Sequence, residues 1–303
     1  MINMKIIVFD IPALNHIASV GPELAGRVVE EWGALQALIA ALSFGAPAAT
    51  RSLQSAAAMV LTQITKAGPE LAQRVAEEGG VLPALVAAVA AGGAAASTSA
   101  LVLAYITRGG PELAWRVAEE RGALLVLAAA AADGAAGASE SVLVLAELVA
   151  ATPGLAQRVA EAPGALPALA TAMAAGGDTA TMRAEALRVI ARTDPALAQR
   201  VAKARGALQA LVAAAAAGGK GSAPARDAVA VVNRWARTAV AAAGAACAHC
   251  GRSADGTAVV RLRVCAGCNA ARFCSAECQR HAWTVHKVAC RALAATSVAN
   301  EGA

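Results

Sequence analysis

The segment GPELAQRVAEEGGVL, residues 68–82, occurs five times in this chain with small variations. The other copies begin at Gly21, Gly110, Thr152 and Asp194. The second residue of each copy is proline, and these prolines lie 47 residues apart once and then 42 residues apart three times. A repeat of this length is typical of helical solenoids, in which each unit buries its apolar face against the next one. The repeat therefore predicts an all-α fold built from stacked units.

Each copy has the features of a helix that begins at its proline. Gly, Thr or Asp precedes the proline at the N-cap position, and proline suits the first helical position because its missing N–H is not needed there. A glycine follows eleven residues after each proline, as at Gly80 and Gly122, and predicts a turn. Two more apolar helices follow, as in GVLPALVAAVAA from Gly80 and ALVLAYIT from Ala100. The pattern therefore predicts three helices in each unit.

This pattern resembles the armadillo repeat family over roughly residues 10–240. Residues 10–20, DIPALNHIASV, match only the last helix of a unit, so we expect a half repeat to open the array. Armadillo arrays that hold extended peptides carry a ladder of asparagines on their third helices. The matching positions here, six residues before each proline, are His16, Gln63, Tyr105, Glu147 and Val189. Four of the five side chains can hydrogen-bond, which leaves a binding groove open, but the missing asparagines argue against importin-like recognition.

One arginine recurs at the same position of every copy. These residues are Arg27, Arg74, Arg116, Arg158 and Arg200. We expect them to pair with neighbouring glutamates or to cover the seam between units, because a long Arg stem covers apolar surface while its charge stays in water.

Composition and charge narrow the possible partners. Apolar residues make up 58% of the chain but aromatic residues only 3%, so the core must be built from Ala, Leu and Val. The net charge is +5, but the sequence has no dense stripe of Lys and Arg such as nucleic-acid binders carry. Nucleic acid is therefore not an expected partner. The uncharged residues 79–107 contain Pro83 and the pair Gly92 and Gly93, which favours two soluble helices over a membrane span. The first residues do not have the pattern of a secretory signal.

All seven cysteines lie between residues 247 and 290; six form three closely spaced pairs, and Cys290 follows His286 by four residues. The candidate metal ligands are Cys247, Cys250, Cys265, Cys268, Cys274, Cys278, His286 and Cys290. Eight ligands suffice for two tetrahedral zinc sites, and two residues between a pair of thiolates let both sulfurs reach one ion. The odd number and regular spacing argue against disulfides. His249 and His281 are not expected to be ligands, because both sites are already full.

The order of these ligands resembles the MYND zinc finger. FCSAECQRHAWTVHKVAC, residues 273–290, is similar to the end of that family's motif. The resemblance implies that the two sites interleave. One zinc would be held by Cys247, Cys250, Cys274 and Cys278, and the other by Cys265, Cys268, His286 and Cys290. The resemblance also implies a shallow groove for short proline-containing peptides, with Gln279 and Trp283 as its binding residues. The long gap between Cys250 and Cys265 predicts a hairpin around Asp255 and Gly256.

These patterns predict a function without catalysis. Four protein ligands leave no open position on either zinc, so both ions are expected to be structural. We expect a helical repeat domain at residues 1–243 and a MYND finger with a short tail at residues 244–303. The repeats offer no nucleophile paired with a base. The chain is therefore predicted to be a non-enzymatic adaptor that binds proteins and no small-molecule substrate.

Two alternatives to the adaptor stay open. The finger would contribute to nucleic-acid-associated regulation of transcription, or it would belong to an uncharacterised enzyme-associated module. In each case the thiolates require a reducing compartment, which predicts the cytoplasm, the nucleus or both.

Overall fold

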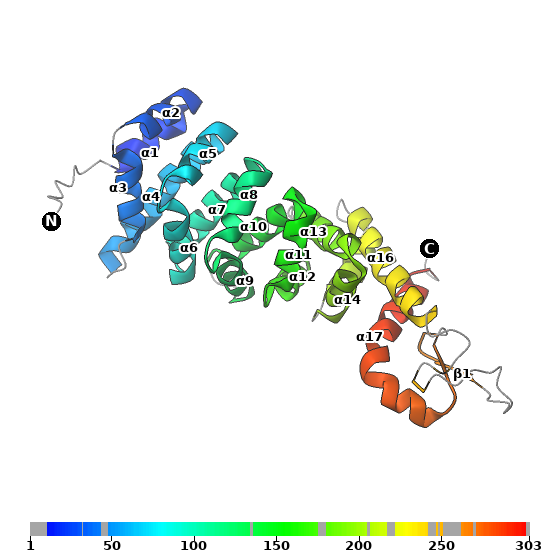
Figure 1. The fold of residues 1–303 in the computed structure, drawn as a ribbon. Helices are drawn as coiled ribbons and strands as arrows, with labels where there is room; N and C mark the ends of the chain where they lie inside the picture. The colour runs from blue at the N-terminus through cyan, green and yellow to red at the C-terminus, as the bar shows by residue number, and fades with distance from the viewer. Residues whose placement is uncertain are drawn as a thin grey trace. The chain divides into compact units, whose positions relative to one another are not determined.

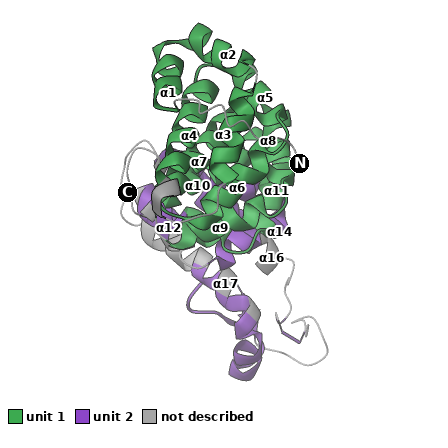
Figure 2. Ribbon diagram, turned by 90° about the vertical axis from the view of Figure 1, so that its left-hand side faces the viewer, with its two compact units in different colours: residues 1–169 green, residues 170–303 purple. Residues whose placement is uncertain are grey.

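A computed structural model describes residues 11–31, 33–43, 48–133, 136–174, 180–204, 207–216, 222–241, 247, 249–250, 262–268 and 271–300. The chain forms two compact units, Met1–Leu169 and Ala170–Ala303 (Figure 2). This division falls within the repeats. The boundary expected between residues 243 and 244 stays a prediction, because residues 242–246 lie outside the described part of the chain.

The described helices follow the predicted repeat (Figure 1). The array begins with the single helix α1 (Ile11–Val20), the expected half repeat. The first helices of the five units are α2 (Pro22–Glu30), α5 (Pro69–Glu77), α8 (Pro111–Glu119), α11 (Pro153–Glu161) and α14 (Pro195–Lys203). The second helices are α3 (Ala34–Ser43), α6 (Val81–Ala91), α9 (Ala123–Asp133), α12 (Ala165–Ala174) and α15 (Ala207–Ala216). The third helices are α4 (Ala48–Lys66), α7 (Ala94–Arg108), α10 (Ala138–Ala151), α13 (Ala180–Thr193) and α16 (Ser222–Ala241).

Local chemistry sets the starts of the first helices and the turns after them as predicted, whereas the third helix predicted from Ala100 already begins at Ala94 in α7. Proline occupies the first turn of every first helix. Thr152 accepts a hydrogen bond from the N–H of Leu155, and Asp194 accepts one from Ala196. The turn after the first helix has positive φ at Gly33, Gly80, Gly122 and Gly164, a conformation that glycine adopts without steric cost. The corresponding Gly206 lies outside the described residues.

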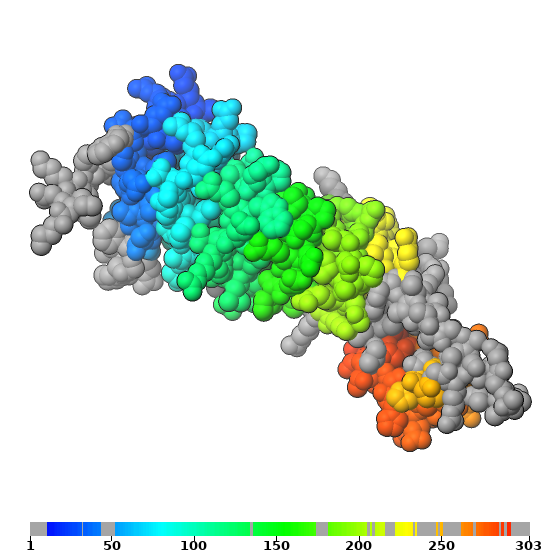
Figure 3. All heavy atoms as spheres, in the orientation of Figure 1, coloured from blue at the N-terminus to red at the C-terminus, as the bar shows by residue number. Residues whose placement is uncertain are grey.

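Small apolar side chains fill the interior of the first unit. Third helices of successive repeats pack together, α4 on α7 and α7 on α10. In Figure 3 the colours of this unit follow one another in chain order, because each repeat lies beside the next. Ala100, Leu103 and Ala104 on α7 are fully buried. At Gly137 the start of α10 approaches α7 so closely that a Cβ would lie 3.1 Å from the backbone of Ala96, so the helix contact requires glycine here.

Two of the recurring arginines join neighbouring repeats, as expected. Arg74 on α5 pairs with Glu30 on α2 at 3.5 Å. Arg158 on α11 donates to the carbonyl of Ala118 on α8 at 3.1 Å, and its guanidinium lies 5.5 Å from the centre of the Trp115 ring. Both contacts cross the seam between one first helix and the next.

The positions that correspond to the asparagine ladder lie on third helices, and two of them take part in contacts within the array. Glu147 on α10 pairs with Nε of Arg108 on α7 at 2.6 Å. The guanidinium of Arg108 also lies 5.7 Å from the centre of the Tyr105 ring. Arg108 thus links two ladder positions from successive repeats.

The second unit contains the last helices of the array and the cysteine-rich segment. There α13, α14, α15 and α16 pack on one another, and α17 (Ala276–Asn300) packs on α14, α15 and α16. The short strands β1 (Arg263–Val264) and β2 (Arg272–Phe273) pair antiparallel, with Val264 opposite Arg272. Among the described residues, no helix combines the length and the apolar composition that crossing a membrane requires.

Two buried hydroxyls in the array lead to a stability prediction. Ser99 on α7 and Ser141 on α10 lie 42 residues apart and are fully buried, and neither hydroxyl has a hydrogen-bond partner among the residues that the structure describes. Ala57 occupies the same repeat position on α4 and is also fully buried.

We expect Ser141→Ala to stabilise the protein by about 1 kcal/mol, because it removes a buried polar group that lacks a partner. Urea unfolding measures this change. Ser139→Ala, at an exposed position of the same helix, should leave the midpoint nearly unchanged; a lower midpoint for Ser141→Ala would contradict the expectation.

Candidate metal centre

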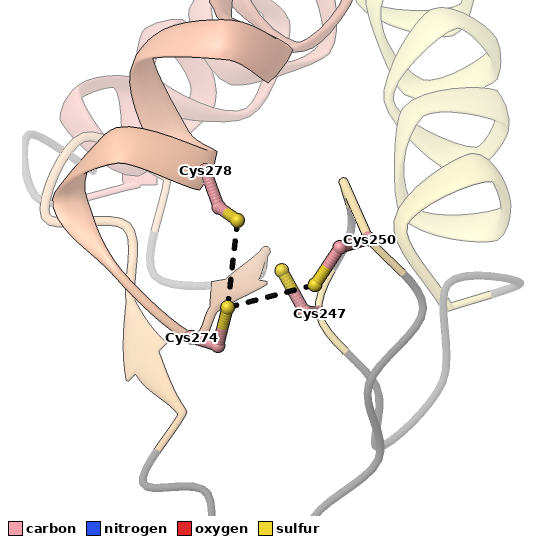
Figure 4. Close-up of side chains that lie close together, drawn as sticks. All are labelled: Cys247, Cys250, Cys274 and Cys278. Atoms are coloured by element: carbon pink, nitrogen blue, oxygen red, sulfur yellow. Dashed lines mark hydrogen bonds between the residues drawn. The ribbon is translucent and has the colours of Figure 1, made fainter.

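Four cysteines from distant parts of the finger segment form the first ligand cluster. Cys247, Cys250, Cys274 and Cys278 place their sulfurs within 4.8 Å of one another. The Sγ of Cys274 lies 3.6 Å from that of Cys250 and 3.4 Å from that of Cys278 (Figure 4). Figure 4 also shows that Cys278 projects from the start of α17 toward the other three sulfurs. The first and third cysteine pairs of the sequence therefore meet.

The start of α17 orients one ligand of this cluster. Ser275 precedes the helix, and its Oγ accepts a hydrogen bond from the backbone N–H of Cys278 at 3.1 Å. A serine at this place satisfies one of the N–H groups that a helix leaves unpaired at its start. Cys278 consequently lies in the first turn of α17, with its backbone N–H held by the serine.

The second cluster contains the second cysteine pair and two residues of α17. Cys265, Cys268, His286 and Cys290 also bring their ligand atoms within 4.8 Å of one another. The sulfurs of Cys265 and Cys290 are 3.7 Å apart, and Nε2 of His286 lies 3.7 Å from the sulfur of Cys268. His286 and Cys290 are four residues apart, so they share one face of the helix. The ring of Phe273 packs edge-on against His286, with 5.3 Å between ring centres.

The spacing of the donor atoms fits tetrahedral metal sites. Ligands bonded at about 2.3 Å to one tetrahedral ion lie about 3.8 Å apart, close to the separations in both clusters. A disulfide would need about 2.05 Å between sulfurs, and all seven cysteines are free thiols. The chain also passes close to the second cluster at Gly267, where a Cβ would lie only 2.9 Å from the sulfur of Cys290. Glycine is thus needed for the second pair to close around its cluster.

Crowding separates the proton affinities of the thiols in the first cluster. Burial raises the pKa of Cys247, but hydrogen bonds from the backbone N–H groups of Cys250 and Cys274 outweigh this effect and lower the pKa to about 6. The hydrogen bonds that Cys274 makes with Cys278 and then Cys250 raise the pKa of Cys274 to about 12. One sulfur of the cluster therefore ionises readily while another keeps its proton.

The second cluster shows the same separation. Burial, followed by the hydrogen bond with Cys265, raises the pKa of Cys290 to about 12. Burial also raises the pKa of Cys265, but the backbone N–H groups of Gly267 and Cys268 reverse this and lower it overall. Burial lowers the pKa of His286, which keeps the imidazole neutral and able to bind a metal. A divalent cation would offset the repulsion that prevents both clusters from ionising fully.

The described residues of the finger form a small apolar core. The buried residues of its core are Cys247, Cys265, Ala271, Phe273, Ala282 and Cys290. Phe273 is the one large apolar side chain among these described residues. The apolar core among the described residues is small for a domain of this size, and a bound ion would add to the free energy of folding.

The two residues that the resemblance assigns to peptide binding both contact the second cluster. Trp283 is 42% exposed, and its ring packs edge-on against His286 with 5.9 Å between ring centres. Gln279 is half-buried, and its Nε2 lies 3.6 Å from the sulfur of Cys265. Their role in binding a peptide stays a prediction. Their positions show that the expected peptide-binding residues lie directly beside the residues of the second cluster.

The other sequence expectations have mixed outcomes. His249 and His281 stack on each other with 5.5 Å between ring centres, and neither belongs to one of the two clusters. The hairpin predicted around Asp255 and Gly256 lies outside the described residues. Sequence reasoning missed Gly267 and Ser275. A serine three residues before Cys278 at the start of a predicted helix was an available signal for the second of these.

The raised pKa values lead to a prediction for the pH dependence of metal binding. Cys274 and Cys290 keep their protons at neutral pH in the metal-free finger, because their pKa values are about 12. A metal ion must displace at least one proton from each cluster, so the affinity of each site should rise about tenfold or more for each unit of pH. Competition with a chelator at about pH 6.5 and about pH 7.5 measures this slope. An affinity that is independent of pH would show that the thiols are already ionised before metal binds.

Comparison with known proteins supports the predicted fold of both the repeat array and the finger. The family model of the MYND finger matches residues 247–290. No curated protein is significantly similar to the chain in sequence. Among solved structures, the designed armadillo repeat protein YIII(Dq)4CqI is 23% identical, with a TM-score of 0.63 over 73% of this chain and 91% of the other.

Two further designed proteins are similar over the same shares of both chains. A designed armadillo repeat protein in complex with the peptide (KR)4 is 23% identical, with a TM-score of 0.62. Computationally designed armadillo repeat proteins for modular peptide recognition are 24% identical, with a TM-score of 0.64. At this level of identity the similarity shows the fold alone. The chain therefore has a helical repeat array with the armadillo fold, followed by a MYND finger at residues 247–290.

Proposed function

We propose that the chain is a non-enzymatic adaptor, in which a helical scaffold carries a finger that binds short proline-containing peptides of other proteins. The observation that supports this best is the position of Trp283. Its ring is anchored at the edge of His286 but keeps 42% of its surface exposed. A fixed, exposed indole offers a flat apolar surface on which a proline ring can pack, and it loses little conformational entropy on binding.

The two ions of the finger are zinc in this proposal. The ligand sets are soft, and structural zinc is commonly held by four thiolates or by three thiolates and one imidazole. Both coordination spheres are filled by the protein, so the ions hold the finger together and leave no position for a substrate. The metal that folds the finger thereby also fixes the surface that binds the partner.

Charge on the finger favours a partner with acidic groups. The described positive side chains near the clusters are all exposed: Arg263, Arg272, Arg280, Lys287 and Arg291. The one acidic residue within the described part of the finger is Glu277, which lies 3.9 Å from His281. Exposed charges of this kind speed association and influence the choice of partner more than they add affinity.

The array acts as the scaffold in this proposal. Its designed relatives include proteins made for peptide recognition, but the ladder positions here carry no asparagine. Tyr105 and Glu147 are engaged by Arg108 within the array. These internal contacts favour the finger as the site of recognition.

The thiolate ligands support a reducing location, and we infer the cytoplasm, the nucleus or both. The positive charge of the finger also keeps one alternative in view, which is contact with nucleic acid during the regulation of transcription. That alternative predicts binding that weakens steeply as salt increases, because counterions are released from phosphates.

A defined peptide library tests the proposal directly. The full chain, loaded with zinc, is expected to bind a subset of proline-containing peptides, and Trp283→Ala should weaken that binding about tenfold or more because it removes the central aromatic contact. Replacing the proline of a bound peptide with alanine should have a similar effect. Trp115→Ala is a matched control, since Trp115 is a half-buried tryptophan of the array.

The pattern of effects separates the possibilities. Equal peptide binding by wild type and Trp283→Ala would exclude the surface around Trp283 as the peptide-binding site. Binding that Trp115→Ala weakens and Trp283→Ala leaves intact would place recognition in the array. Tight, salt-sensitive binding of DNA or RNA without peptide binding would favour the nucleic-acid alternative.

A further inference from the structure

The side chain of Gln279 makes a contact that peptide binding does not explain. Its Nε2 lies 3.6 Å from the sulfur of Cys265, within the range of a hydrogen bond to sulfur. Gln279 is half-buried, and Cys265 is buried. A carboxamide has two N–H groups and one oxygen, so donating one N–H to the sulfur leaves a donor and an acceptor for other partners.

Gln279 has a position that involves both ligand clusters. It directly follows Cys278, a ligand of the first cluster, and its side chain reaches Cys265 of the second. On α17 it shares one face with Trp283, His286 and Cys290, which follow at intervals of four, three and four residues. The first turn of α17 is itself fixed by the bond from Cys278 to Ser275. The amide is therefore held beside the sulfur by a helix that both clusters anchor.

A hydrogen-bond donor beside Cys265 would stabilise the second cluster when a metal is bound. With three thiolates, one neutral imidazole and a divalent ion, the site has a net negative charge, and hydrogen bonds to its sulfurs stabilise that charge. The backbone N–H groups of Gly267 and Cys268 already point at Cys265. The side chain of Gln279 adds a donor from a different element. Residues that orient or hydrogen-bond metal ligands commonly change metal affinity about 10- to 100-fold when they are mutated.

We propose that Gln279 is a positioning residue of the second metal site, whose amide N–H stabilises the Cys265 thiolate and thereby slows the loss of zinc from this site. The proposal rests on the identity of the ion as zinc, but it does not depend on peptide binding. It also gives Gln279 a role distinct from the exposed ring of Trp283, although the two residues lie on the same helix face.

Release of zinc from the full, reduced chain tests this role. The zinc-loaded protein is mixed with excess chelator, and native mass spectrometry follows the ions that remain. We expect Gln279→Ala to lose one of its two ions about tenfold faster than wild type, while the other ion is lost at nearly the wild-type rate. When the thiols of Gln279→Ala are alkylated during zinc release and the modified peptides are identified by mass, Cys265 and Cys290 should react before Cys250 and Cys274.

Gln279→Glu distinguishes a hydrogen bond from simple packing. The two side chains have the same shape, but a carboxylate offers no N–H and repels a thiolate. The proposal predicts faster loss for Gln279→Glu than for Gln279→Ala, whereas a packing role would leave the glutamate variant closer to wild type. Thr284→Ala, at an exposed position of the same helix, should release both ions as wild type does.

Three results would overturn the proposal. These are wild-type release rates in both Gln279 variants, equal acceleration of both ions in Gln279→Ala, and release from Gln279→Glu that is slower than from Gln279→Ala. A wild-type chain that takes up no zinc would instead contradict the identity of the ions. Normal zinc release combined with absent peptide binding would leave this role intact and contradict only the adaptor function.

Discussion

We propose that two bound ions, held by eight ligand atoms, keep the finger folded, because the apolar core among its described residues is small. Phe273 is the one large side chain in the described core of the finger, and the other buried residues are cysteines and alanines. Without a metal, each cluster combines a thiol whose pKa is lowered with another whose pKa is raised to about 12, so the sulfurs repel one another or share protons. A divalent ion converts this crowding into attraction.

The array gains its stability from helix packing and not from metal ligands. Its helices begin at capped prolines and bury Ala, Leu and Val against the next repeat, so stability accumulates from neighbour to neighbour. It contains no cysteine, and some of its charged side chains join adjacent repeats, as Arg74 does with Glu30 and Arg108 with Glu147. The finger is not separate from this packing, because α17 lies against α14, α15 and α16 within one compact unit. A ligand-held module thus continues directly from the last repeat.

Local chemistry explains what could be predicted from the sequence. The prolines and the glycines that follow them predicted the starts of the first helices and the turns after them, because caps and positive φ values depend on neighbouring residues only. The match of residues 10–20 to the last helix of a unit predicted the half repeat at α1. Cysteine spacing predicted the ligands, and the resemblance to the MYND finger implied the same interleaved sets that the structure brings together. Contacts between distant residues were not predictable, since they depend on helix packing: the amide of Gln279 beside Cys265, the close approach at Gly267 and the pair formed by Arg108 and Glu147.

Hydrogen exchange on the reduced full chain, with zinc bound and after its removal by a chelator, tests the dependence of the finger on metal most directly. Mass spectrometry of the same samples establishes how much zinc remains. We expect removal of the ions to abolish protection of the amides in residues 262–290, while amides of α5 to α10 keep theirs. Unchanged protection of residues 262–290 in protein shown to be free of metal would contradict the central claim that the ions hold the finger together.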